Sequence, residues 1–155
     1  MRTTHLLTHV PPLAQDGALV VLRLAAAAIF IAHGAGDIFD ADVENNVANY
    51  ADAGIPLAAV AAPFAAYAQF IGGILMIPGL LVRVWSACVL VVMAGALIWV
   101  HRGEGLTMGQ DGSGAGFALS MGAISLALLL LGPGRYSLDA VLTNRWAPQR
   151  ETVTV

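Results

Sequence analysis

The first long apolar block reads ALVVLRLAAAAIFIAHGA and occupies residues 18–35. Three more blocks follow at about residues 57–82, 84–100 and 115–131. Each is close to the ~20 residues that cross a hydrocarbon core of ~30 Å. Hydrophobic residues make up 58% of the 155 residues, and a chain of this size lacks the polar surface to cover four such blocks in water. We therefore predict an all-α membrane protein, a bundle of four transmembrane helices in a lipid bilayer.

The connections between these blocks divide the chain further. We expect a tail at residues 1–17, a transmembrane domain at 18–142 and a polar C-terminal tail at 143–155. Residues 36–56 are acidic and are predicted to form a long loop, whereas blocks two and three meet in a tight link near Val82 and Arg83. Residues 101–114 form a glycine-rich connection.

The placement of the basic residues predicts the orientation of the bundle. All seven are arginines, and only Arg102 falls at the end that carries the acidic loop. The other end holds Arg2, Arg23, Arg83, Arg135, Arg145 and Arg150. The positive-inside rule then places both termini in the cytoplasm. No polybasic tract is present, which argues against a nucleic-acid partner, and the single cysteine, Cys88, rules out a disulfide within the chain.

Polar side chains inside the apolar blocks are costly, so each needs an explanation. The main ones are Arg23, His33, Gln69 and His101. Arg23 is interpreted as an interfacial anchor or structural partner, with a cation that holds a ligand headgroup as the alternative. Gln69 is expected to hydrogen-bond another helix, or else to contact a ligand.

A second group of polar residues is predicted at the outer end. If the first helix continues, His33, Asp37, Asp40 and Glu44 follow one helical stripe. His101 and Glu104 lie at the same predicted level. These side chains are candidates for a proton relay, for a quinone contact, or for a metal site formed by His33, Asp37, His101 and Glu104. A solvated acidic loop with two interfacial histidines is the alternative, and no CxxCH motif for covalent haem is present.

Several short stretches together resemble the DoxX-like family of four-helix bacterial membrane proteins. The resemblance extends over about residues 18–142. It is carried by Arg23-Leu24, residues 29–34 ending in His33-Gly34, Gly54-Ile55-Pro56, Gln69 to Gly73, Gly79 to Arg83, Val100-His101 and Gly132 to Asp139. The matching motif positions include Gly34, Gly72, Gly73, Arg83, Gly134, Arg135, Tyr136, Ser137 and Asp139.

This resemblance implies a multi-pass protein of the bacterial inner membrane. Some relatives are subunits of thiosulfate:quinone oxidoreductase, and others are linked to oxidative stress or sulfur metabolism. Two departures weaken inherited proton-transfer chemistry. Gln69 stands where the family often has a glutamate, and Asp37 or a neighbour stands where it often has a lysine.

The sequence therefore favours a small accessory subunit of a respiratory or redox membrane complex, rather than a self-sufficient enzyme. Such a subunit would dock or stabilise partner subunits and contact lipid or quinone. One alternative is a quinone-reactive subunit of the thiosulfate:quinone oxidoreductase type, in which Arg23, His33, Gln69 and His101 contact the headgroup. Another is a membrane protein that binds a metal or haem at its outer face.

Overall fold

The computed structural model describes residues 10–107 and 114–146. The greater part of each predicted tail, at residues 1–9 and 147–155, and residues 108–113 of the glycine-rich connection lie outside the described residues. The helix α2 spans Pro12–Ala35 and continues as the π-helix η1 at Gly36–Asp40. The remaining elements are α3 at Val43–Asp52, α4 at Ala58–Met76, α5 at Val82–Gly95, the π-helix η2 at Ala96–Val100, α6 at Gly116–Leu131 and α7 at Leu138–Trp146.

Three helical segments are long and apolar enough to cross a membrane, namely Pro12–Asp40, Ala58–Met76 and Val82–Val100. The fourth, Gly116–Leu131, is shorter at 16 residues but is equally apolar in character. Large hydrophobic side chains on all four are exposed outside the bundle, among them Val21, Val60, Val91 and Leu130. Exposure of such side chains around a small bundle is what a lipid surrounding allows. The chain is therefore a multi-pass membrane protein.

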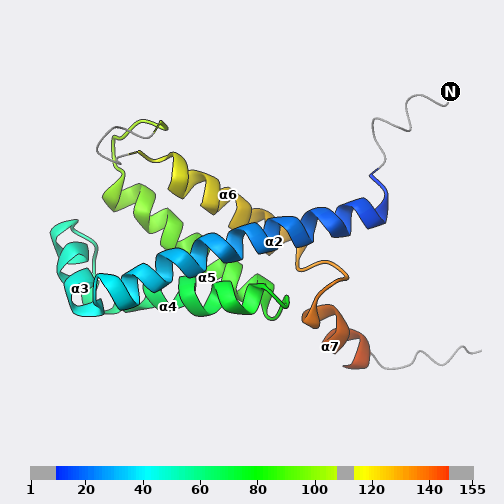
Figure 1. The fold of residues 1–155 in the computed structure, drawn as a ribbon. Helices are drawn as coiled ribbons and strands as arrows, with labels where there is room; N and C mark the ends of the chain where they lie inside the picture. Colours follow the sequence, from blue (N-terminus) through cyan, green and yellow to red (C-terminus); the bar gives the residue numbers. More distant parts are fainter. Residues whose placement is uncertain (1–9, 108–113, 147–155) are drawn as a thin grey trace, which may run out of the picture.

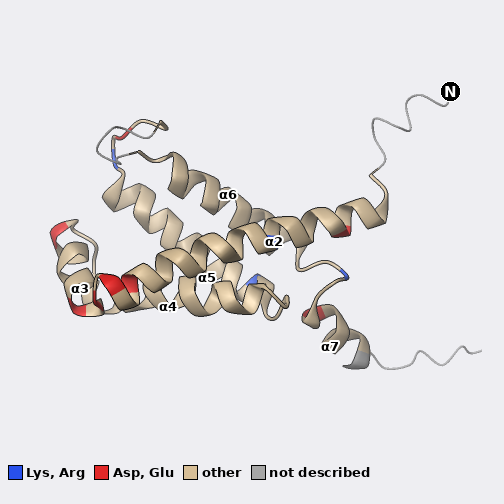
Figure 2. Ribbon diagram, viewed as in Figure 1, with Lys and Arg blue, Asp and Glu red and all other residues tan. Residues whose placement is uncertain are grey.

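The two ends of the bundle differ in structure and charge. Figure 1 shows α3 and the connection between η2 and α6 at one end, which we call the α3 end. The described start of α2, the turn between α4 and α5, and α7 lie at the opposite end, the α7 end. Acidic residues gather at the α3 end (Figure 2). The first and last described helices thus reach the same end of the bundle, as four crossings require.

The helices pack in two close pairs. α2 lies along α4, and α5 lies along α6, while α3 packs against α4. Gly34 allows the first pair to form, because a Cβ atom there would collide with the backbone of Phe70 and Ala66. A Cβ at Gly73 would come within 2.8 Å of Ile31 on the same interface. Small residues that bring two helix backbones together are a common basis for packing within lipid.

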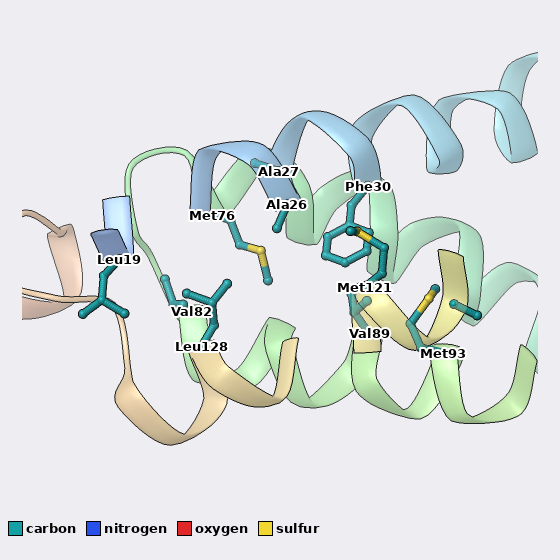
Figure 3. Packing of buried hydrophobic residues seen from close by; sticks show 11 residues of the cluster. Leu19, Ala26, Ala27, Phe30, Met76, Val82, Val89, Met93, Met121 and Leu128 are labelled. Atoms are coloured by element: carbon teal, nitrogen blue, oxygen red, sulfur yellow. The ribbon is translucent and has the colours of Figure 1, made fainter. Parts of the chain in front are cut away.

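The buried core runs between these pairs (Figure 3). It consists of side chains from all four long helices, including Phe30, Met76, Val89, Met121 and Leu128. Each of these five side chains is less than a tenth exposed. Because the core joins both helix pairs, the four helices form one bundle rather than two separate hairpins.

The structure corrects several boundaries expected from the sequence. The first helix begins at Pro12, since proline suits the first turn of a helix, and not at Ala18. The second span ends at Met76 instead of Val82, because Pro78 and Gly79 form a turn in which Gly79 has a φ of +75°. The tight link therefore precedes Val82, where α5 already begins.

The expectation of a long loop over residues 36–56 is wrong. These residues continue α2 as η1 and then form α3, with a break at Asp42, where φ is +62°. Asn46 of α3 donates a side-chain hydrogen bond of 2.9 Å to the backbone oxygen of Asp37. The predicted stripe of acidic residues accordingly ends at Asp40, and Glu44 lies on the separate helix α3.

Candidate functional site

At the α7 end, the charged side chain of Arg23 is buried, with 3% of its surface exposed. Its two terminal nitrogens donate hydrogen bonds to the backbone oxygens of Pro133 (2.7 Å) and Tyr136 (2.9 Å). Gly79 leaves room for it, since a Cβ there would lie 2.8 Å from Nη1. Arg23 therefore ties the first helix to the segment after α6 and has a structural role here.

The segment 132–139, which the sequence analysis singled out, completes this end of the bundle. The two carboxylate oxygens of Asp139 accept hydrogen bonds from backbone N–H groups at the start of α5. The donor is Leu81 in one bond (2.8 Å) and Val82 in the other (3.0 Å). A carboxylate at a helix N-terminus satisfies otherwise unpaired donors and is stabilised by the helix dipole. The Ser137 hydroxyl donates to the oxygen of Gly134 (2.7 Å) and accepts from the N–H of Ala140.

An ion pair fixes the same segment to the first helix. Arg135 donates from Nε to Asp16 at 2.7 Å and from its backbone N–H to the same carboxylate at 3.1 Å. The hydrogen bond with Asp16 raises the pKa of the Arg135 guanidinium above its ordinary value. Residues 132–139 thus form a clasp that holds α2, α5 and α7 together.

Gln69 is buried in α4, and its amide nitrogen donates to the backbone oxygen of Ala65 at 3.2 Å. This bond lies within one helix, one turn apart, and not between helices as expected. Three residues later, the absence of a side chain at Gly72 lets the ring of Trp85 pack against α4. A Cβ atom at Gly72 would lie 3.2 Å from that ring. Both terminal nitrogens of Arg23 and the amide nitrogen of Gln69 are therefore bonded within the fold, whereas the buried Nε of Arg23 has no hydrogen-bond partner among the residues that the structure describes.

His33 and Arg23 do not share a site. They lie ten residues apart on the same helix, about 15 Å at 1.5 Å per residue. The imidazole of His33 is exposed on the side of the bundle and faces the ring of Phe117 at the start of α6, with a centroid separation of 4.7 Å. A headgroup held jointly by Arg23 and His33 is not compatible with this separation.

Three polar side chains, those of His33, Asp37 and Tyr50, form a series that leads toward the α3 end. Asp37, one turn further along, interacts electrostatically with His33 and also with the phenol of Tyr50 on α3. Tyr50 is half-buried, and burial, together with the nearby Asp37 charge, raises its pKa above the ordinary value near 10. Like any tyrosine with a pKa of 10 or more, Tyr50 is protonated at neutral pH and can donate a hydrogen bond.

Tyr50 lines a pocket of about 250 Å³ at this end of the bundle. The other walls come from the 55–56 segment, α4, α5 and η2. Its side chains are apolar or aromatic and include Ile55, Ala65, Val92, Trp99 and Val100. A small apolar pocket with tyrosine and tryptophan side chains in its wall suits a flat ring.

His101 and Glu104 lie just beyond this pocket. The imidazole Nδ1 of His101 is 2.8 Å from a carboxylate oxygen of Glu104, which also accepts the N–H of Gly114 at 2.6 Å. These bonds join the two described ends of the glycine-rich connection. Within residues 10–107 and 114–146, no three His, Cys, Asp or Glu side chains are grouped as metal ligands would be. A metal site formed by His33, Asp37, His101 and Glu104 stays a prediction.

The comparison with protein families agrees with this arrangement. The model of the DoxX family matches residues 18–102, more than half of the chain. The chain belongs to the DoxX family. No curated protein and no solved structure matches it.

The DoxX match covers α2 from Ala18 through η2 and ends just after His101. The clasp at 132–139 lies beyond the matched region, although it bonds to Arg23 and to the start of α5, both inside it. The resemblance over 18–142 is thus confirmed for its first two thirds.

Three aromatic residues of the site were not predicted from the sequence, namely Tyr50, Phe117 and Trp99. Tyr50 lay in the segment expected to be a loop. A helical spacing could have found Tyr50, because Asn46 and Tyr50 are four residues apart and share the face of α3 nearest Asp37.

Proposed function

We propose that this DoxX protein is a small integral membrane subunit of a redox assembly, and that it holds a quinone-type ring in the pocket beside Tyr50. The observation that carries the proposal is the apolar pocket lined by Tyr50 and Trp99, and the charge of Asp37 lies close enough to affect Tyr50. The volume of about 250 Å³ suits one ring rather than a large ligand. The family resemblance independently connects such chains with quinone-linked assemblies.

The residues of this site have separable roles in the proposal. Tyr50 donates a hydrogen bond to a ring oxygen from its hydroxyl, which is protonated at neutral pH. Asp37 and His33 extend the series toward the side of the bundle, where they can exchange protons with the membrane interface. A bound quinone would supply the redox chemistry, with electrons from a partner.

The α3 end also offers a surface for such a partner. Asp40, Asp42, Glu44 and Asp52 are exposed there, and residues 36–56 contain no Lys or Arg (Figure 2). The nearby ring of Phe39 is 69% exposed. An acidic surface with an exposed aromatic side chain complements a partner with basic and apolar groups. We propose that the partner subunit docks at this end.

Binding of a short-chain benzoquinone tests the ring site directly. We expect the quinone to quench the fluorescence of Trp99 in the purified wild-type protein, and Trp99→Phe to remove that part of the signal. Loss of one hydrogen bond in Tyr50→Phe should weaken binding about fivefold to tenfold. Tyr136→Phe is the matched control, because its exposed side chain lies at the α7 end.

Two results would contradict the ring site. One is quenching that is unchanged in Trp99→Phe, and the other is equal affinity in Tyr50→Phe and Tyr136→Phe. The assembly is tested separately by purification in mild detergent. A redox partner should elute with the wild-type chain and should be lost when Asp40, Asp42 and Glu44 are replaced by their amides. A wild-type chain that always elutes alone argues against the assembly.

A further inference from the structure

A groove at the α7 end lies between α7 and the start of α5. It encloses about 600 Å³ and is lined by Arg83, by apolar side chains that include Leu81, Val84 and Leu142, and by polar groups of Asn144. The membrane-crossing segment Val82–Val100 begins at its wall. We therefore expect the groove to lie at the level where hydrocarbon meets the headgroups of the lipids.

Arg83 is an exposed cation that the fold holds in position. Its Nη2 donates to the backbone oxygen of Leu130 at 3.2 Å. Its guanidinium also lies against Gly132, where a Cβ would come within 3.1 Å of Nε. Within the described part of the chain, the ion pairs are His101 with Glu104 and Arg135 with Asp16, so Arg83 has no carboxylate partner there.

The acidic residue in the groove is already engaged. Asp139 also lines it, but its two oxygens accept the N–H groups of Leu81 and Val82 at the start of α5. Its negative charge is thus directed at a helix N-terminus, where the positive end of the helix dipole offsets it. The guanidinium of Arg83 remains the group in this groove that is available to an anion.

The other wall of the groove belongs to a helix with an exposed apolar face. Leu138, Val141 and Leu142 follow a three- and four-residue spacing on α7, and each is between 43% and 45% exposed. Leu81 and Val84 across the groove are about half exposed as well. Helices with such a face lie at the membrane interface with their apolar side chains among the acyl chains.

We propose that this groove binds an anionic phospholipid, with the lipid phosphate on Arg83 and an acyl chain along Leu81, Val84 and Leu142. A guanidinium presents paired N–H donors that match two phosphate oxygens. The unpaired positive charge favours a lipid with net negative charge over a zwitterionic one. The site is independent of the ring pocket, which lies at the opposite end of the bundle.

Lipid retention by the full-length protein, measured by native mass spectrometry from mild detergent, tests this site. We expect the wild-type protein to retain phosphatidylglycerol in preference to phosphatidylcholine. Arg83→Gln should reduce the phosphatidylglycerol retained about fivefold, and Arg83→Lys should restore part of it. Arg102→Gln is the matched control, because that exposed arginine lies at the α3 end.

Asn144→Glu provides a second variant that leaves Arg83 in place. It puts a carboxylate in the groove from an exposed position on α7, so it should lower phosphatidylglycerol retention as Arg83→Gln does. Unchanged retention in both variants would overturn the proposal, as would equal retention of the two lipids. Displacement of the lipid by inorganic phosphate alone would also overturn it, since the site would then recognise a free anion.

Discussion

Arg23 carries its charge inside the bundle, where two backbone oxygens of the clasp accept its hydrogen bonds. This geometry decides between the two interpretations that its position in the sequence allowed. A cation bonded to Pro133 and Tyr136 holds the fold together and is not directed at a headgroup. The sequence could not decide this, because the partners lie more than 100 residues away along the chain.

Replacement of Arg23 by methionine should therefore act on stability. Arg23→Met leaves two carbonyl oxygens of the clasp without a donor, and the cost of each buried, unpaired group is about 1–3 kcal/mol. We expect the free energy of unfolding in detergent to fall by about 2–4 kcal/mol. Arg102→Met, at an exposed position, serves as the control. Equal free energies of unfolding for the two variants would show that the clasp does not depend on Arg23.

The ionisation of Tyr50 makes the stability of the folded protein depend on pH in the alkaline range. Its pKa in the folded protein is raised above the value near 10 of an unfolded chain, so the folded state binds this proton more tightly. The associated stability is present below pH 10 and is lost as the pH rises through the folded-state pKa. The phenolate absorbance of the wild type minus that of Tyr50→Phe should rise with a midpoint above pH 10. A midpoint at or below pH 10 would contradict the assigned environment.

At the scale of elements, the apolar blocks predict the long helices well and their ends poorly. Length and hydropathy suffice to place a crossing helix, but its end depends on individual residues such as Pro78 and Gly79. The acidic composition of residues 36–56 favoured a loop, whereas contacts with η1 and α4 stabilise a helix at 43–52. The sequence offered His33 and Asp37 as candidate site residues, whereas the pocket beside Tyr50 depends on tertiary contacts that no local pattern encodes.

The close pairing of α2 and α4 is testable with two glycines of the same helix. A Cβ at Gly34 would meet the backbone of Phe70 and Ala66, which cannot move aside as a flexible side chain can. We expect Gly34→Ala to reduce the free energy of unfolding by about 1–3 kcal/mol through overpacking.

Gly17→Ala is the matched control for that experiment. Nothing lies within 4 Å of a Cβ at Gly17, which is also in α2, so alanine there should be neutral or slightly stabilising. Chemical unfolding in detergent measures both variants. A Gly34→Ala protein as stable as Gly17→Ala would show that α2 and α4 are not packed this closely.

At the scale of the whole molecule, charge is distributed unevenly between the two ends of the bundle. The acidic α3 end lies opposite the arginine-containing α7 end (Figure 2). From the positive-inside rule we predict that the α7 end is cytoplasmic. The proposed ring pocket and the proposed lipid groove then face opposite sides of the membrane. A bundle of four crossings depends on α6, with its 16 residues, spanning the bilayer like the three longer segments.

Labelling with a membrane-impermeant thiol reagent in intact cells tests this arrangement most directly. In a Cys88→Ala background, Asn49→Cys places a thiol on an exposed position of α3, and Asn144→Cys places one on α7. We expect Asn49→Cys to react in intact cells and Asn144→Cys to react only after permeabilisation. Reaction of both thiols from the same side of the membrane would contradict a four-crossing bundle.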